Sequence, residues 1–568
     1  MKIVHVNTYD IQGGAARGAY RLHQGLRRLG QDSLMLVKHK NSTDPTVHSI
    51  PNLNINNINE YQFEAIQNSY INRNRTTVSN TLFSFPYPGI DISKHQEILN
   101  ADIINLHWIA YFQSSLTLKK VFSLSKPVVW KFPDMWPFTG GCHYSAGCDK
   151  YKKDCVKCPQ LTDDTYNLPA ILLKDKLELW SDSNITIVTP SHWMAENIKQ
   201  STLFKNNRIE VIPNSLDTNA FFPLSKAEAK NIIGVNQNDF IILFGAHTCY
   251  EKRKGFAELL TALHHCLDND YFYKLVSENK IKLVCFGYPP AEAMESIPIP
   301  LLTVGFTDSD QKLQEVYSAA DIFIQPALEE NFGFTTIESM SCSTPVIGFD
   351  VGVVPDVVKD GITGKIIPVG DTHKMAEAII ECVLSPQHCK LMGENSRKLV
   401  EEEYPLTVQA KRYIELYEDL VNSHNKLLLQ VADKTINKSS DKTNTKVNAN
   451  QELATIPLDI ELGNNLNLIF DKLALKALLA ECNHQKQSIQ ELRNNLHNSQ
   501  SQLEKTQAEL HQTHAELHQI HTELHQTQAE LYQVKIDITA MESSKFWKLR
   551  QIWFQLKAHL KLFHNGSF

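Results

Sequence analysis

The chain has 568 residues, of which 42% are hydrophobic, so it is long enough to bury the cores of more than one domain. Its net charge of −7 excludes the global basic field typical of nucleic-acid-binding proteins. The 11 cysteines are scattered, which favours a reducing compartment over a disulfide framework. No run of 18 apolar residues is present and no signal peptide is expected, so the sequence predicts a cytoplasmic protein.

The first elements predict an α/β unit. Residues 2–7 suit a strand, and Gly13-Gly14 leads into a helix that ends near Leu29. A glycine pair between strand and helix lets the backbone approach a ligand, although a simple tight turn is the alternative. Residues 102–108 suit another strand, which would carry His107 to the carboxyl edge of the sheet, where such sheets bind ligands.

Four cysteines follow one another closely as C-x5-C-x6-C-x2-C, at Cys142, Cys148, Cys155 and Cys158. Four thiols with a terminal C-x-x-C suit tetrahedral zinc, and a site with four thiolates is closed and therefore structural. The sequence predicts a structural zinc ion that shapes this loop. Two disulfides, or reduced thiols without metal, are the alternatives.

Two adjacent cations, Arg253 and Lys254, lie just before a helix that begins near Ala257. Cations at such a position would neutralise a diphosphate leaving group. A solvated basic turn is the alternative, because such turns are common on protein surfaces.

An anion seat is predicted near residue 330. Residues 322–324 suit a buried strand, Asn331 and Gly333 form a turn, and Thr335 or Thr336 would cap a helix through Met340. A strand, a glycine turn and a helix N-terminus favour phosphate. Glu330 and Glu338 flank this seat with seven residues between them, a spacing that a solvated helix face also shows.

This pair of glutamates brackets a Phe-Gly turn and is followed by Pro345-Val346 and by glycine turns through Gly364. The run resembles the retaining group 1 glycosyltransferases of family 4, which have the GT-B fold. The resemblance covers residues 1–421. It implies two Rossmann-like doubly wound domains: an acceptor-side domain at 1–220 and a nucleotide-sugar-binding domain at 221–421, with a helix at 406–421 packing back on the first.

The resemblance implies transfer of a sugar from a nucleotide donor to a glycan or lipid-linked acceptor, with retained configuration, in polysaccharide or glycoconjugate synthesis. No metal is needed for catalysis, because Lys, Arg and a helix dipole replace it. Carried over by position, the catalytic residues are Glu330, Lys254, Arg253 and His107. The donor-binding residues are Gly13, Gly14, Gly305, Asn331, Phe332, Gly333, Phe334, Thr335 and Glu338.

Two departures from the family pattern leave alternatives open. Pro133 stands where the family often has a histidine before Asp134, so either His107 substitutes for it or that role is absent. The family's first phosphate-binding arginine position is occupied by a residue of 246–248, so Arg253 would compensate. A nucleotide-sugar epimerase on the same fold, or a scaffold that has lost activity, are the alternative functions.

The C-terminal quarter predicts three further segments. Residues 422–470 lose periodicity and suit a flexible linker, and residues 471–542 carry leucine-rich heptads typical of a coiled coil, which implies a homo-oligomer. Residues 543–568 form a basic, aromatic tail. This tail suits either an anionic membrane surface, at the inner face of the membrane, or docking against the chain's own globular part.

Overall fold

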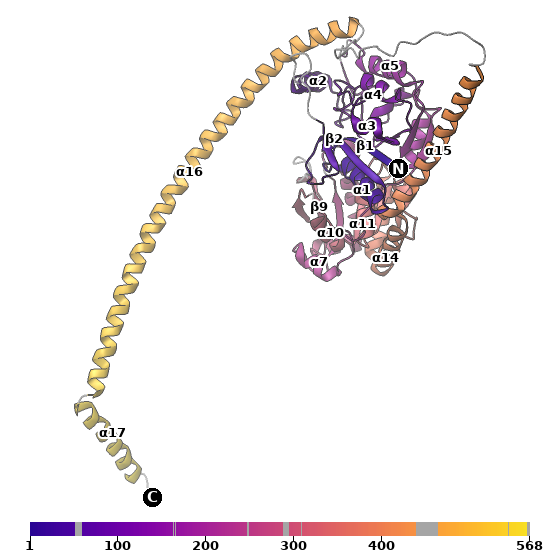
Figure 1. The fold of residues 1–568 in the computed structure, drawn as a ribbon. Coiled ribbons are helices and arrows are strands. Elements are labelled where there is room, and N and C mark those ends of the chain that lie inside the picture. The colour runs from indigo at the N-terminus through magenta and orange to yellow at the C-terminus, as the bar shows by residue number, and fades with distance from the viewer. Residues whose placement is uncertain are drawn as a thin grey trace. The chain divides into compact units, whose positions relative to one another are not determined.

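The structure is a computed structural model that describes residues 1–50, 60–162, 164, 166–246, 249–287, 295–307, 309–438, 464–543 and 545–564. The chain divides into two compact units, Met1–Ala477 and Leu478–Phe568. The first unit contains two parallel sheets covered by helices, and a long helix supplies most of the second (Figure 1). The predicted α/β class with two doubly wound sheets is therefore confirmed.

The first sheet has seven parallel strands in the order β3-β2-β1-β4-β5-β6-β7, and we call the part of the chain that carries it the N-terminal lobe. Its central strands are buried along their whole length, because helices cover both faces of a parallel sheet. The strands are β1 (Lys2–Tyr9), β2 (Asp32–His39), β3 (Val47–Ser49), β4 (Ile103–Leu106), β5 (Val128–Lys131), β6 (Ile185–Thr189) and β7 (Arg208–Val211). The helices are α1 (Gly14–Arg28), α2 (Glu60–Asn74), α3 (Gln96–Asn100), α4 (Ser115–Phe122), α5 (Leu168–Trp180) and α6 (His192–Lys199).

The second sheet has six parallel strands in the order β10-β9-β8-β11-β12-β13 and defines the C-terminal lobe. Its strands are β8 (Phe240–Gly245), β9 (Ile281–Phe286), β10 (Leu301–Gly305), β11 (Ile322–Gln325), β12 (Val346–Phe349) and β13 (Gly364–Ile367). Its helices are α7 (Lys226–Ile232), α8 (Phe256–Cys266), α9 (Asp270–Ser277), α10 (Asp310–Ala319), α11 (Phe334–Ser341), α12 (Val354–Val357), α13 (Thr372–Leu384) and α14 (Pro386–Glu403). The strand predicted at 322–324 is β11, inside this sheet.

The chain returns to the N-terminal lobe through α15 (Leu406–Lys438). This helix packs against α1, where Tyr413 and Tyr417 are buried beside Leu22 and Leu26. The approach is close: a Cβ on Gly25 would lie 2.5 Å from the carbonyl oxygen of Leu406. The helix continues beyond its predicted end at 421 to Lys438, so a linker beginning at 422 is wrong. The remainder of the predicted linker up to 463 lies outside the described residues.

The helix α16 (Asn464–Ser543) begins at the end of the first unit. The second unit consists of the part of α16 from Leu478 onward, followed by α17 (Lys545–His564). The heptad leucines of α16 from Leu492 to Leu531 are exposed; Leu510 and Leu517, for example, have exposed fractions of 58% and 63%. The structure describes one copy of this helix, so the coiled coil stays a prediction. Among the described helices, none is both long enough and apolar enough to cross a membrane.

Candidate functional site

The first turn of α11 forms the centre of the candidate site. Gly333 precedes the helix with a φ of 59°, and no side chain caps the helix start. The predicted Thr335 or Thr336 cap is wrong, because both residues lie inside the helix. Gln325 at the end of β11 donates a hydrogen bond to Thr335 Oγ1 at 3.3 Å instead. An uncapped helix start presents backbone N–H groups and the positive end of the helix dipole.

Glu330, which lies just before this turn, is held by two cations. Its Oε2 lies 2.5 Å from Lys254 Nζ and 3.1 Å from Arg253 Nη1. Its Oε1 accepts from the backbone N–H of Asn331 at 3.1 Å and from the Tyr144 hydroxyl at 3.3 Å. Burial alone would raise the pKa of Glu330, but Lys254 and Arg253 more than offset burial and bring it to about 2. The carboxylate is therefore charged throughout the physiological range.

Glu338, on the second turn of α11, is buried and contacts both lobes. Tyr317 donates a hydrogen bond to it at 3.2 Å, and Arg21 of α1 lies 3.5 Å from it. The Arg21 guanidinium also lies 4.9 Å from the ring centre of Phe334. Arg17, one turn earlier on α1, pairs with Asp310 of α10. Sequence reasoning missed both arginines, although two arginines four residues apart, the first of them three residues after a glycine pair, were a readable signal.

The predicted glycine pair lies beside the start of α11. Gly13 has a φ of 85° and precedes α1. A Cβ on Gly14 would lie 3.7 Å from the Phe334 ring, and one on Gly18 would lie 3.0 Å from it. Gly14 and Phe334 are the first residues of their helices, so two helix N-termini from different lobes meet at one place. This arrangement can bind an anion. The donor-binding role expected for Gly13, Gly14, Gly333, Phe334 and Thr335 stays a prediction.

The other predicted donor-binding residues differ in their position. Asn331 bridges the lobes: it donates to the Phe132 carbonyl at 3.0 Å and accepts from the Ser191 hydroxyl at 2.8 Å. Phe332 is buried, with its ring centre 5.3 Å from that of Phe334. Gly305 lies at the exposed end of β10, where its carbonyl accepts from the N–H of Gly287.

His107, predicted as catalytic, lies inside the N-terminal lobe. It is buried, and its Nε2 lies 2.8 Å from Nδ1 of His5. Burial, followed by the nearby charges of His5 and Lys131, lowers its pKa well below the usual value. It therefore pairs with a second buried histidine and not with the Glu330 cluster, and its catalytic role stays a prediction.

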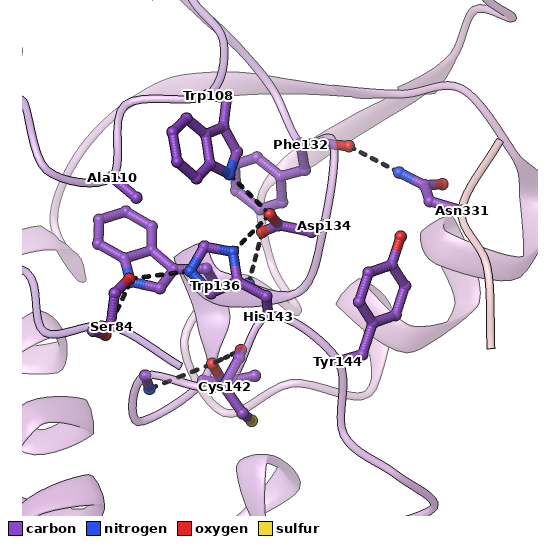
Figure 2. A network of polar contacts seen from close by, with 12 residues as sticks. Ser84, Trp108, Ala110, Phe132, Asp134, Trp136, Cys142, His143, Tyr144 and Asn331 are labelled. Atoms are coloured by element: carbon purple, nitrogen blue, oxygen red, sulfur yellow. Dashed lines mark hydrogen bonds and ion pairs between the residues drawn. The ribbon is translucent and has the colours of Figure 1, made fainter. Parts of the chain in front are cut away.

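A different histidine, His143, lies beside Asp134. Figure 2 shows its Nδ1 pointing at Asp134 Oδ2, 2.7 Å away, and its Nε2 at the Ser84 hydroxyl, 2.8 Å away. Asp134 also accepts from Trp108 Nε1 at 2.9 Å and from the N–H of Trp136 at 3.0 Å. Sequence reasoning missed His143 because it lies ten residues after Pro133, the position where the family histidine was expected.

The four cysteines of the 142–158 loop line one small cavity of about 20 Å³, and none of them forms a disulfide. The predicted alternative of two disulfides is therefore not realised. As the side chains stand in the described part of the chain, no group of three or more His, Cys, Asp or Glu residues is arranged so that it could hold a metal ion. The buried Lys176 amine lies near this cavity and donates to the carbonyls of Trp136 and Thr139 at 2.5 and 2.9 Å.

The chain is similar to known proteins over part of its length. Residues 225–399 match the model of the glycosyl transferases group 1 family. The chain is 24% identical over 254 residues to the alpha-maltose-1-phosphate synthase of Mycobacterium tuberculosis, covering 41% of this chain and 63% of that protein. It is 24% identical over 221 residues to the N-acetyl-alpha-D-glucosaminyl L-malate synthase of Bacillus anthracis, covering 38% and 55%. The chain thus spans less than two thirds of the length of these curated relatives.

Solved structures agree on the fold. The sucrose-phosphate synthase of Thermosynechococcus elongatus superposes with a TM-score of 0.51 at 16% identity, covering 74% of this chain and all of that one. Anabaena HepE, solved with UDP and glucose, superposes with a TM-score of 0.50 at 14% identity, covering 74% of this chain and 99% of the other. Together these findings show a GT-B fold whose C-terminal lobe matches the glycosyl transferases group 1 family over residues 225–399.

Proposed function

We propose that the chain is a retaining glycosyltransferase that moves a sugar from a nucleotide-sugar donor to a glycan or lipid-linked acceptor. The observation that supports this most directly is the Glu330 cluster: a buried carboxylate paired with Lys254 and Arg253 beside the uncapped start of α11. Two cations and a helix N-terminus stabilise the charge that develops on a departing diphosphate. The match of residues 225–399 to the group 1 family supports the same assignment.

Within this proposal, the residues divide the work. Lys254 and Arg253 take up the diphosphate, which competes with Glu330 for the two cations. Glu330 then turns toward the donor sugar and orients its hydroxyl groups. Glu338, which now faces Arg21 and Tyr317, accepts from the ribose. The acceptor hydroxyl attacks from the same face that the diphosphate leaves, and the leaving phosphate takes the proton.

Donor binding tests the proposal. Isothermal titration of the purified chain with a panel of UDP- and GDP-sugars should detect one donor class. Lys254→Ala should weaken binding of that donor about 10- to 100-fold, because a charge-assisted contact to phosphate contributes about 1.5–3 kcal/mol. Lys365→Ala is the matched control, since Lys365 belongs to the same lobe but pairs with Glu381, outside the site.

Failure of every nucleotide sugar to bind a folded sample would overturn the transferase assignment and favour a scaffold. If the bound donor is instead converted to its epimer with no acceptor present, the epimerase alternative replaces the transferase.

We further propose that the four-cysteine cluster holds a structural zinc ion. Four thiols around one cavity form a donor set that zinc prefers. The positively charged form of the nearby buried Lys176 would offset part of the charge of four thiolates. The metal has no part in the transfer step; it would shape a loop that has little core of its own.

We also propose that α16 pairs with a second copy of the chain and that α17 lies on an anionic membrane surface. The heptad leucines of α16 are exposed in one copy, and an a-position stripe is buried when two such helices pair. On α17, Phe546, Trp553 and Phe554 are exposed among Lys548, Arg550 and Lys557. This composition suits a helix in a membrane interface, where a lipid-linked acceptor would be at hand.

A further inference from the structure

A short loop of the N-terminal lobe reaches the Glu329–Glu330 pair of the C-terminal lobe. The loop comprises residues 143–147, and we call it the clasp. At its root, His143 is fixed to Asp134 and Ser84 at 2.7 and 2.8 Å. Its next residue, Tyr144, is buried, donates to Glu330 Oε1 and lies under Arg253, with the guanidinium carbon 4.1 Å from the ring centre. The clasp therefore contacts both the Glu330 carboxylate and the Arg253 guanidinium of the proposed diphosphate site.

The tip of the clasp holds the neighbouring carboxylate, Glu329. The Ser145 hydroxyl donates to its Oε1 at 2.8 Å, the N–H of Ala146 to its Oε2 at 2.8 Å, and the N–H of Gly147 to its Oε1 at 3.0 Å. Ala146 and Gly147 have φ values of 53° and 75°, in the left-handed region. Successive N–H groups in such a turn point to one side and form a concave anion site.

This contact is unusual in its charge balance. Glu329 has only 9% of its surface exposed, and no cation pairs with it among the described residues. A buried carboxylate without a cation is costly unless hydrogen bonds satisfy it, and here all three donors come from the opposite lobe. If the lobes separate, Glu329 loses all three bonds and regains water. The contact is therefore specific to the arrangement in which the lobes are together.

We propose that the clasp holds the two lobes in a closed arrangement, with Glu329 as its anchor, and that it thereby fixes the orientation of Glu330. Glu329 is a positioning residue: it anchors the turn that carries Tyr144 onto Glu330 and Arg253. The link is short, because Glu329 and Glu330 are adjacent in the chain and so are Tyr144 and Ser145. The effect on catalysis rests on the proposed glycosyltransferase function. The role of the clasp in holding the lobes together is independent of that function.

Amide hydrogen exchange on the full chain tests closure without any assay of activity. In Glu329→Gln, the peptide that covers residues 144–147 should exchange about tenfold faster, since the amide oxygen is a weaker acceptor than a carboxylate. Glu381→Gln is the matched control, because Glu381 lies on the same lobe and pairs with Lys365, away from the clasp. Equal exchange in wild type and Glu329→Gln would overturn the proposal.

A double-mutant cycle tests the positioning role. With the donor identified by titration, Glu329→Gln should lower kcat for donor turnover about tenfold and change KM less than twofold. Ser145→Ala should lower kcat less, and the double variant should be no slower than Glu329→Gln, because both changes break one contact. The control cycle combines Ser145→Ala with Glu381→Gln, whose effects should add, because Glu381 pairs with Lys365 outside the clasp.

Additive effects of Ser145→Ala and Glu329→Gln would overturn the positioning role. The two proposals fail in different ways. If no donor binds but residues 144–147 lose protection in Glu329→Gln, the glycosyltransferase function fails and the clasp stands. If a donor binds and protection is unchanged, the clasp fails and the function stands.

Discussion

The two lobes and the C-terminal helix α16 differ in whether their side chains have partners within the chain. In the lobes, the acidic groups of the site are buried and find partners inside the chain, as Glu330 does with Lys254 and Glu329 does with the clasp. Along α16, the heptad leucines are more than half exposed. Apolar stripes of this length are favourable only when something covers them. The lobes therefore pair their polar groups within one chain, whereas the exposed leucines of α16 support the proposal that this helix pairs with a second copy.

The largest effect is expected from breaking the lobes' ion pairs. Lys254→Ala should reduce donor turnover about 100- to 1000-fold, because the lysine stabilises charge on the leaving group. The oligomeric state, measured by light scattering, should not change, since Lys254 lies far along the chain from the heptads. A variant that loses oligomerisation together with activity would contradict the separation of the two regions.

A smaller but still large effect is expected from the cysteine cluster. Cys158→Ser should abolish the one zinc ion per chain that we expect by elemental analysis of the purified protein. It should also lower the melting temperature by about 5 °C, the shift expected from a loss of about 2 kcal/mol in a domain of roughly 200 residues. Cys266→Ser is the control: it alters a buried core thiol and should keep the zinc. Wild-type protein without zinc would refute the metal site.

Low pH should reduce the free energy of unfolding of the lobes, because it protonates Glu330. Its pKa falls from an ordinary value near 4.3 to about 2 on folding, so its stabilising contribution is complete above about pH 4.3 and is lost as the pH falls toward 2. Each pKa unit corresponds to about 1.4 kcal/mol. Melting temperatures measured from pH 5 to pH 2 should therefore fall more steeply for wild type than for Glu330→Gln. Parallel curves for the two proteins would contradict this assignment.

The smallest effect on the lobes is expected from the helix. Leu517→Asp should dissociate the oligomer, because it places a charge in the seam between paired helices. The free energy of unfolding of the lobes should change by less than about 0.5 kcal/mol, as is usual for an exposed position. Glu516→Gln, one residue away and off the seam, is the control. An unchanged oligomer in Leu517→Asp would show that the heptads are not the contact.

The sequence by itself determined the repeating features of this protein. Short buried apolar runs separated by amphipathic helices predicted both parallel sheets, because such strands are covered on both faces. The turn at Gly333 and the cations before α8 also followed from local patterns, since backbone conformation and charge depend on neighbouring residues.

Contacts between the lobes were decided only by the tertiary structure. No local pattern predicted that Arg21 reaches Glu338 or that Glu329 is held by residues 145–147. The partners in these pairs lie hundreds of residues apart in the chain. The sequence does not show which of its many carboxylates and hydrogen-bond donors meet. Which ones meet depends on how two separately folded sheets are placed, and that placement is set by packing over the whole interface.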